Sequence, residues 1–294
     1  MSNDTGAPMG RRQFMQTAAA AGAAAATFGI LNPANADEKA SGETLKVGLI
    51  GCGGRGTGAA LQAISADPNT KLIALADTFK DNIAATRDKL QKSPAGDRVQ
   101  VDDGHMFDGL DGYKQLIDVC DVVVHATTPG FRPMHLRAIA EAGKHCFVEK
   151  PIAVDPTGVR SVMESSKMFK DKGKCLVSGL CYRYQFSKQD IMKRIHDGAL
   201  GELIYGACYW NGGVIWTKDR GPDMSDMEWQ LRDWGYFTWL SGDHIVEQHL
   251  HNIDIMRWVI GRTPVKAMAL GGRQARPNHP NYGHIYDHFA VEFE

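Results

Sequence analysis

Closely spaced glycines follow a short, mostly apolar stretch, and this combination is typical of a loop that binds phosphate groups. Residues 45–50 form the apolar stretch, the next six residues fit the pattern G-x-G-x-x-G, and a helical pattern covers residues 57–66. The order strand, glycines, helix is what a dinucleotide site requires, because unpaired amides at the start of the helix hold the pyrophosphate. We therefore predict cofactor contacts from the members of this loop, Gly51, Gly53, Gly54, Arg55 and Gly56.

Asp77 ends the next apolar stretch, about 20 residues beyond Gly56, where a ribose-binding carboxylate belongs. A carboxylate accepts hydrogen bonds from the ribose hydroxyls and repels a 2′-phosphate, so Asp77 favours NAD over NADP. The same side chain is equally suited to cap a helix predicted over residues 80–90. Its place after the glycine loop favours the cofactor role.

Alternating strand and helix patterns must position these residues. After the strand at residues 71–76, strand patterns recur at residues 99–101, 122–126, 146–148 and 174–178. Helical patterns lie between them, over residues 112–118, 133–142 and 156–170. This alternation predicts an α/β fold with a doubly wound parallel sheet, a Rossmann domain. Thr127, Thr128 and Pro129 close one strand at the carboxyl edge of the sheet, where ligands bind in such folds.

The sequence changes character after residue 180. A helical pattern covers residues 188–197, and strand patterns cover residues 204–209, 265–271 and 288–294. An aromatic-rich loop lies among them. We predict a linker at residues 37–44, a cofactor-binding domain at residues 45–180 and a second domain at residues 181–294, which the family resemblance described next implies is for substrate binding and oligomerisation.

Two motifs of the predicted sheet resemble those of the glucose–fructose oxidoreductase and inositol dehydrogenase family, Gfo/Idh/MocA. They are Cys146-Phe147-Val148-Glu149-Lys150-Pro151 after Ala142-Gly143-Lys144-His145, and Ala126-Thr127-Thr128-Pro129 with His135. The resemblance extends from residue 45 to residue 294 and implies a C-terminal α+β domain with a mainly antiparallel sheet. It also implies cofactor contacts from Thr127, Thr128, Pro129, His135, Glu149 and Lys150.

In that family the lysine of Glu-Lys-Pro lies beside the nicotinamide ring and contacts the substrate hydroxyl. The resemblance assigns this role to Lys150. A cation beside the reacting hydroxyl lowers its pKa as hydride leaves the carbon. The alternative is a lysine in an ordinary surface salt bridge.

A second family signature, an aspartate and a histidine four residues apart on a helix, is matched here by Glu247 and His251. Residues at i and i+4 share a helical face. The resemblance thus implies that His251 is the general base and that Glu247 holds its tautomer or binds substrate. Glutamate in place of aspartate, and His249 where glycine is usual, are departures from the family pattern. His244 would lie on the same face, but the histidines lack a spacing such as H-E-x-x-H and no metal is predicted.

Further substrate contacts are expected from Arg183 and from Trp234 in the aromatic-rich loop. Aromatic rings pack against the C–H faces of sugars, although the same rings could simply fill the core. The family's second domain has a broader sheet than these residues provide. We therefore expect a truncated chain, and a homo-oligomer when the protein is full length.

The N-terminal residues have the features of an export signal. Arg11 and Arg12 precede a weakly apolar run over residues 18–31 and the small-x-small pattern Ala34-Asn35-Ala36. These features predict a twin-arginine signal peptide over residues 1–36, export by the twin-arginine machinery, and a periplasmic or extracellular location. The run is shorter than the roughly 20 residues of a membrane span, so no stable membrane insertion is expected. The cysteines lack a CxxC spacing, and we predict free thiols.

Composition narrows the possible functions. A net charge of −1 without a dense basic block outside the N-terminus gives no electrostatic support for nucleic-acid binding. The favoured function is an NAD(P)-dependent oxidoreductase acting on a sugar or cyclitol hydroxyl carbon. The second is an NAD-dependent glycoside hydrolase that works by transient oxidation, elimination and hydration, for which tightly bound NAD would be regenerated in each turnover. The third, a non-catalytic sugar or nucleotide binder, fits less well with the retained Asp77, Lys150 and His251.

Overall fold

A computed structural model describes residues 44–294, beginning with β1 (Leu45–Ile50). The predicted signal peptide at residues 1–36 lies outside the described residues, as does nearly all of the predicted linker.

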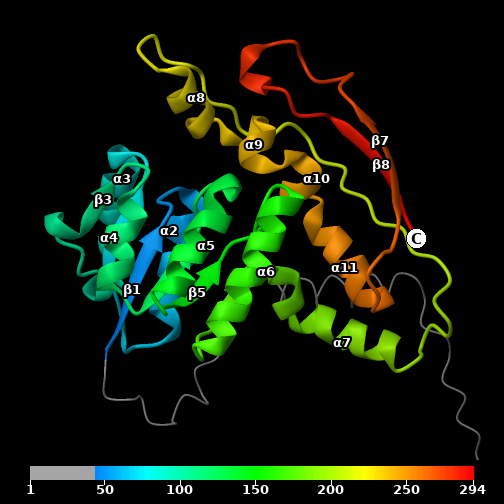
Figure 1. The fold of residues 1–294 in the computed structure, drawn as a ribbon, viewed down its shortest axis with the longest axis horizontal. Helices are drawn as coiled ribbons and strands as arrows, with labels where there is room; N and C mark the ends of the chain where they lie inside the picture. Colours follow the sequence, from blue (N-terminus) through cyan, green and yellow to red (C-terminus); the bar gives the residue numbers. More distant parts are fainter. Residues whose placement is uncertain (1–43) are drawn as a thin grey trace, which may run out of the picture. The chain divides into compact units, whose positions relative to one another are not determined.

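A six-stranded parallel sheet forms the first part of this structure, in the order β3-β2-β1-β4-β5-β6 (Figure 1). This is the strand order of a doubly wound dinucleotide-binding fold, in which the order of the strands reverses between β1 and β4 while all strands stay parallel. The carboxyl ends of β1 and β4 therefore border the crevice in which such folds bind ligands. The remaining strands are β2 (Thr70–Asp77), β3 (Met106–Asp108), β4 (Val122–His125), β5 (His145–Val148) and β6 (Leu176–Ser178).

Helices cover both faces of the sheet. One apolar core joins it to α4 (Gly112–Val119), α5 (Arg132–Glu141) and α6 (Pro156–Asp171). A second core joins it to α2 (Gly54–Ala66) and α3 (Lys80–Gln91). Because both faces are covered, the central strands are apolar on both sides, and this explains their continuous apolar runs in the sequence.

Short helices and one pair of strands form the second part. The strands β7 (Ala267–Gly272) and β8 (His288–Phe293) pair antiparallel. The helices are α7 (Phe186–His196), α8 (Asp226–Arg232), α9 (Thr238–Ser241), α10 (Asp243–Glu247) and α11 (Leu250–Ile260). The predicted fold class is thus confirmed: a parallel doubly wound sheet is followed by an α+β part with a small antiparallel sheet.

An apolar cluster ties the second part to the first. Its buried members come from α8, α9 and the segments beside them: Trp229, Leu231, Tyr236, Phe237, Leu240 and Ile285. Phe79 and Phe131, which follow the carboxyl ends of β2 and β4, pack against this cluster. The second part is therefore anchored at the edge of the sheet where ligands bind.

Two predicted strands are absent from the described residues. Residues 99–101 form only a single bridge, from Val99 to Leu72, and the third strand of the sheet is β3 instead. Val99 and Val101 are buried in the core beside α2 and α3, so their apolar character serves burial and not strand pairing. Residues 204–209 form no strand because no neighbouring strand pairs with them, and a lone strand is unstable in water.

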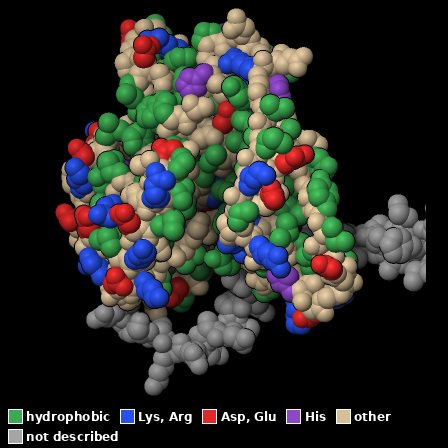
Figure 2. All heavy atoms as spheres, turned by 45° about the vertical axis from the view of Figure 1, so that its right-hand side comes forward, with side chains coloured by type: hydrophobic (Ala, Val, Ile, Leu, Met, Phe, Trp, Pro, Cys, Tyr) green, Lys and Arg blue, Asp and Glu red, His purple; other side chains and the backbone are tan. Residues whose placement is uncertain are grey.

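The surface and the thiols agree with the composition. Lys and Arg side chains are interspersed with Asp and Glu over the face shown in Figure 2. All six cysteines lie in the described region and are unpaired, as predicted; Cys175 and Cys181 are exposed. None of the helices described is long and apolar enough to cross a membrane.

Candidate active site

The glycine loop leaves an open cradle at the start of α2. Gly51 has a φ of +96°, and a Cβ on it would lie 2.4 Å from the Thr127 amide nitrogen. A Cβ on Gly56 would lie 1.8 Å from the Gly51 carbonyl oxygen, so both positions require glycine. A Cβ on Gly53 or Gly54 would meet nothing within 4 Å, and no side chain caps the first turn of α2. The open space and the uncapped amides fit a pyrophosphate group.

Asp77 lies beside this loop but already accepts several hydrogen bonds. Its Oδ2 accepts from the Cys52 amide at 2.7 Å, and its Oδ1 accepts from the Phe79 amide at 2.9 Å and from Asn82 Nδ2 at 3.1 Å. It thus links the glycine loop to the segment before α3, but it does not cap that helix, whose N-cap is Phe79 without a side-chain cap. Each carboxylate oxygen has two acceptor sites, so Oδ2 retains one for a ribose hydroxyl.

A depression with an empty volume of about 300 Å³ adjoins Asp77 at the carboxyl ends of β1, β2 and β4. Thr127 and His135 line it, so these predicted cofactor residues border the same space as Asp77. Thr128 and Pro129 lie in the turn after β4 and shape it, since Phe131 N donates to the Thr128 carbonyl at 3.1 Å. The depression is well placed for the adenosine half of a dinucleotide.

His135 is buried and belongs to a pair of histidines. Its Nδ1 lies 3.0 Å from Nε2 of His125, and its ring stacks on Tyr113 with the ring centroids 3.9 Å apart. Burial lowers the pKa of His135 to about 4, so the ring is neutral at physiological pH. Its Nε2 is buried without a partner in the structure, which leaves one ring nitrogen for a ligand in the depression.

Glu149 and Arg55, both predicted to contact the cofactor, contact each other. Arg55 Nε donates to Glu149 Oε1 at 2.7 Å, and the Glu149 side chain is only 6% exposed. This ion pair joins the Glu-Lys-Pro turn after β5 to the first turn of α2. Two parts of the predicted cofactor site are therefore in direct contact.

Arg132 was missed in the sequence, and it fastens the turns after β4 and β5 to each other. Its buried guanidinium donates to the carbonyls of Thr127, Glu149 and Pro151 at 2.6–2.9 Å. Burial lowers the pKa of Arg132 to about 10, and it remains charged at physiological pH. An arginine at the start of a helix carries no sequence signal for this role.

Lys150 reaches across to the second part of the chain. Its Nζ donates to Glu247 Oε1 at 2.7 Å and to the Glu247 carbonyl at 2.5 Å, and both side chains are less than one fifth exposed. The Lys150–Pro151 peptide bond in this turn is cis. The structure thus brings together two of the predicted catalytic residues, which lie at the carboxyl edge of the sheet.

The helix predicted to carry both Glu247 and His251 is broken between them. The helix α10 ends at Glu247, and α11 begins at Leu250. The amides of Gln248 and His249 both donate to the His244 carbonyl, which closes the last turn of α10. The prediction of one shared helical face is therefore wrong.

Tertiary contacts explain this break. Asp243, at the start of α10, accepts from the Tyr286 amide at 2.8 Å, while Lys150 holds the other end of the helix. The helix α11 is held separately, because Arg183 donates to both carboxylate oxygens of Asp254 at 2.7 Å. The two helices are thus held by different contacts, so they do not continue as one helix.

His251 nevertheless lies close to the pair of Lys150 and Glu247. Its ring centroid is 4.8 Å from that of Tyr182, and its Nδ1 is buried without a partner in the described structure. Burial lowers the pKa of His251, and the charge of Lys150 lowers it further, while Glu247 opposes this. A neutral imidazole beside a lysine is suited to accept a proton. Within residues 44–294 no hydrogen bond joins His251 to Glu247, so Glu247 does not hold its tautomer here.

The two remaining predicted substrate residues lie in structural contacts. The guanidinium of Arg183 is occupied by Asp254 and stacks on Trp258 at 5.1 Å. Trp234 packs against the third apolar cluster, with its ring 5.7 Å from that of Trp216. Neither side chain lines the cavity beside Glu247.

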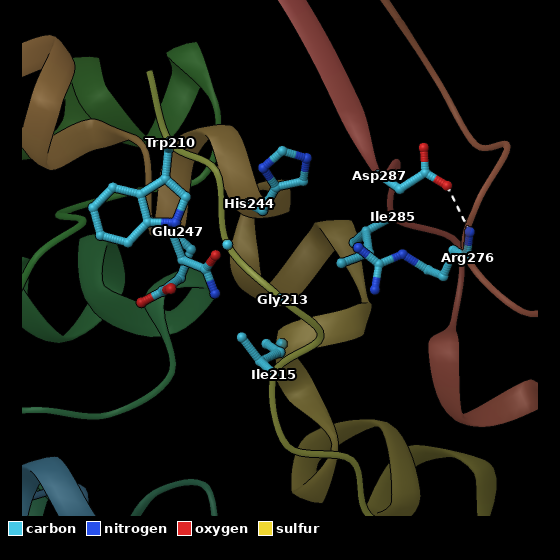
Figure 3. Close-up of a pocket in the computed structure, with 11 residues that line it drawn as sticks. Trp210, Gly213, Ile215, His244, Glu247, Arg276, Ile285 and Asp287 are labelled. Atoms are coloured by element: carbon cyan, nitrogen blue, oxygen red, sulfur yellow. Dashed lines mark hydrogen bonds between the residues drawn. The ribbon is translucent and has the colours of Figure 1, made fainter. Parts of the chain in front are cut away.

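That cavity has an empty volume of about 510 Å³, and Figure 3 shows Glu247 and Trp210 at one end and Arg276 at the other. Its lining residues are Trp210, Gly212, Gly213, Ile215, Gly235, His244, Glu247, Gln248, Arg276, Ile285 and Asp287. Trp210 takes the place predicted for Trp234. Arg276 had no sequence signal, because it lies in a loop between two strands and far from every motif. In the part of the chain that is described, no group of three or more His, Cys, Asp or Glu side chains is arranged to hold a metal ion.

Comparison with known proteins agrees with the fold. Residues 45–180 match the family model GFO_IDH_MocA, described as an oxidoreductase family with an NAD-binding Rossmann fold. Inositol 2-dehydrogenase of Rhizobium meliloti (strain 1021) is 25% identical over 226 residues, which are 77% of this chain and 58% of that protein. A glycosyl hydrolase family 109 protein of Streptomyces niveus is 30% identical over 210 residues, which are 68% of this chain and 38% of that protein.

Solved structures share the fold. The crystal structure of myo-inositol 2-dehydrogenase from Lactobacillus plantarum aligns with a TM-score of 0.61 at 22% identity, over 86% of this chain and 66% of that one. This chain spans less than two thirds of the length of the inositol 2-dehydrogenase from Rhizobium meliloti.

Proposed function

We propose that this chain, which belongs through residues 45–180 to the Gfo/Idh/MocA oxidoreductase family, transfers hydride between a nicotinamide cofactor and a hydroxyl-bearing carbon of a sugar or cyclitol. The observation that carries the proposal is the meeting of Lys150, Glu247 and His251 at the carboxyl edge of the sheet that holds the glycine loop. A cofactor in the loop would extend along this edge toward Lys150.

One group of residues would bind the cofactor. The cofactor supplies a ring carbon that accepts or returns hydride. The amides at Gly53 and Gly54 would hold its pyrophosphate, and Asp77 would accept from its ribose. Asp77 supports a preference for NAD over NADP, because a carboxylate repels a 2′-phosphate. The ion pair of Arg55 with Glu149 closes the loop against the catalytic turn and supports tight binding.

A second group, Lys150, Glu247 and His251, would bind the substrate and accept its proton. An ammonium has three donors, and Lys150 uses two of them on Glu247 in this structure. The third is available for the substrate hydroxyl, whose pKa the lysine lowers as hydride leaves. Neutral His251 would then take the proton. The Oε2 atom of Glu247 has no described partner and is suited to accept from a neighbouring substrate hydroxyl.

The test is to add sugars and cyclitols to the purified full chain with NAD and to follow the absorbance of reduced nicotinamide. A substrate should produce reduced cofactor, and the Lys150→Met variant should not. If no aldose, ketose or inositol produces reduced cofactor, the proposal is contradicted.

A second candidate function is an NAD-dependent glycoside hydrolase that acts by transient oxidation, elimination and hydration. The similarity to the family 109 glycosyl hydrolase of Streptomyces niveus favours it. In this case the protein should release the aglycone from aryl glycosides without net formation of reduced cofactor. Measuring aglycone release and cofactor absorbance on the same sample distinguishes the two functions.

We also propose export through the twin-arginine pathway to a periplasmic or extracellular location, supported by Arg11 and Arg12 in the sequence. Assembly as a homo-oligomer is proposed on a separate observation. Large apolar side chains are exposed on β7 and in the segments beside it, namely Ile204, Tyr205, Val265, Met268 and Leu270. Hydrophobic side chains are visible on the side of the molecule that Figure 2 brings forward.

A further inference from the structure

Arg276 reaches into the cavity beside Glu247 without an ion-pair partner. The loop before it is held by Asp287, whose Oδ2 accepts from the amides of Gln274, Ala275 and Arg276 at 2.8 Å each. The guanidinium donates from Nη2 to the Tyr286 carbonyl at 3.1 Å, and its Nε is buried without a partner. Figure 3 shows the guanidinium directed toward the middle of the cavity. The side chain is therefore fixed in place with donors left over.

Neither carboxylate of the same cavity accepts a hydrogen bond from this guanidinium among the contacts described for residues 44–294. Glu247 is paired with Lys150 at 2.7 Å. Asp287 accepts three backbone amides and also pairs with His288 Nδ1 at 2.6 Å. Among the ion pairs of residues 44–294, none includes Arg276. The guanidinium therefore keeps donors without a carboxylate acceptor, and an anionic group on a ligand would supply that acceptor.

His244 adds a neutral donor to the same end of the cavity. Its Nε2 is buried and unpartnered in the described structure. Burial lowers the pKa of His244, and the charge of Arg276 lowers it as well, while Asp243 opposes this. A neutral imidazole carries its proton on one ring nitrogen and can donate from Nε2. His244 and Arg276 thus both line the cavity, and each has a nitrogen without a partner in the described structure.

From this arrangement we propose that the cavity binds a sugar acid, with the carboxylate received by Arg276 and His244. The planar fork of a guanidinium matches the two oxygens of a carboxylate. A single cation compensates a carboxylate but not a phosphate dianion, so a uronate fits better than a sugar phosphate. The placement of the substrate's reacting hydroxyl at the Lys150 and Glu247 end rests on the proposed function, whereas the binding of the carboxylate does not.

Calorimetry on the NAD-loaded full chain tests the proposal with matched ligands. D-glucose and D-galactose are each compared with their uronates, which differ only by a carboxylate in place of the terminal hydroxymethyl group. At least one uronate should bind roughly 10- to 100-fold more tightly than its hexose, the range for a hydrogen bond to a charged group. The absence of any such preference overturns the proposal, and tighter binding of D-glucose 6-phosphate than of D-glucuronate overturns the assignment to a carboxylate.

Variants of Arg276 distinguish the effect of its charge on ligand binding from an effect on folding. Arg276→Gln should remove the preference for the uronate while hexose binding changes little, and Arg276→Lys should retain part of it. Arg262→Gln, at an exposed arginine without a described contact, is the matched control and should retain the full preference. A uronate preference that survives in folded Arg276→Gln overturns the proposal. If Arg276→Gln does not fold, the preference of the unaltered protein decides.

The absorbance of reduced nicotinamide keeps the two proposals apart. Uronate binding that depends on Arg276 without any cofactor reduction supports this site and contradicts the oxidoreductase. Cofactor reduction by neutral sugars, without tighter binding of any uronate, supports the oxidoreductase and overturns this site.

Discussion

Lys150 Nζ lies 2.7 Å from Glu247 Oε1, although the two residues are 97 positions apart in the sequence. This contact joins the turn after β5 to the end of α10, so it connects the cofactor-binding sheet with the cavity lined by the second part. The lysine is held at a defined point and keeps a donor for a substrate. The predictions below follow from this arrangement and from the groups around it.

Lys150→Met should lower turnover strongly, because the reacting hydroxyl loses its positive partner. Positioned proton transfer and charge stabilisation are typically worth roughly 10²–10⁴-fold in rate. The affinity for NAD should change little, since the pyrophosphate is held at the start of α2. Steady-state rates and NAD titrations measure both effects. Lys170→Met, at an exposed position on α6, is the control; equal losses in the two variants would contradict the role of Lys150.

His251 should act as a base with a pKa below its ordinary value of about 6.5. The base is active when neutral, so kcat/KM should rise with pH through this lowered pKa and level off above it. In Lys150→Met the pKa of His251 should rise, because the positive charge that lowers it is gone. Nuclear magnetic resonance titration of the His251 ring in both proteins measures the shift, and a pKa that stays put would count against this arrangement.

His249→Asn should cost much less activity than His251→Asn. His249 lies in the turn between α10 and α11, with its Nε2 3.7 Å from the sulfur of Cys208, whereas His251 lies beside Lys150. Steady-state kinetics of the two variants compare the positions directly. The reverse order of effects would show that the base has been assigned to the wrong histidine.

Asp77→Asn should narrow the preference for NAD over NADP. The amide retains an oxygen for the Phe79 hydrogen bond but removes the charge that repels a 2′-phosphate. Affinities for the two cofactors, measured by titration, should converge in the variant. Asp118→Asn, exposed on α4, serves as the control, and equal affinity for both cofactors in the unaltered protein would contradict the prediction.

Acid should weaken the fold through His135. Its pKa is about 4 in the folded state and about 6.5 when unfolded, so between these values the unfolded chain binds more protons. The stabilisation is present above pH 6.5 and is lost as the pH falls toward 4, by roughly 3 kcal/mol at most. Denaturant unfolding across this range should show a shallower acid loss in His135→Phe than in the unaltered protein. Identical pH profiles would refute the prediction.

Local patterns in the sequence predicted most of the first part of the fold, except for β3, which was placed at residues 99–101. Gly51 and Gly56 are required by close backbone contacts within one strand–loop–helix unit, so their spacing is visible in the sequence. The break between Glu247 and His251 was not predictable, because it depends on anchors from Tyr286, Lys150 and Arg183 that are distant in the sequence.

The same reason explains the residues that were missed. Apolar residues near Val99 serve burial as well as pairing, so their pattern did not distinguish the two. Arg132 donates to backbone carbonyls, and Arg276 donates to one carbonyl and lines a cavity. Such contacts do not require a sequence motif. Motifs located the Glu-Lys-Pro turn, whereas tertiary contacts decided which residues face it.

The guanidinium of Arg132 has a consequence for how this edge of the sheet can evolve. One side chain supplies the donors for carbonyls in both the turn after β4 and the turn after β5. A lysine could not span these acceptors, since its donors diverge from a single nitrogen. The two turns are therefore constrained together in evolution. Loss of Arg132 would remove, in one step, the contacts that align the turn after β4 with the turn after β5.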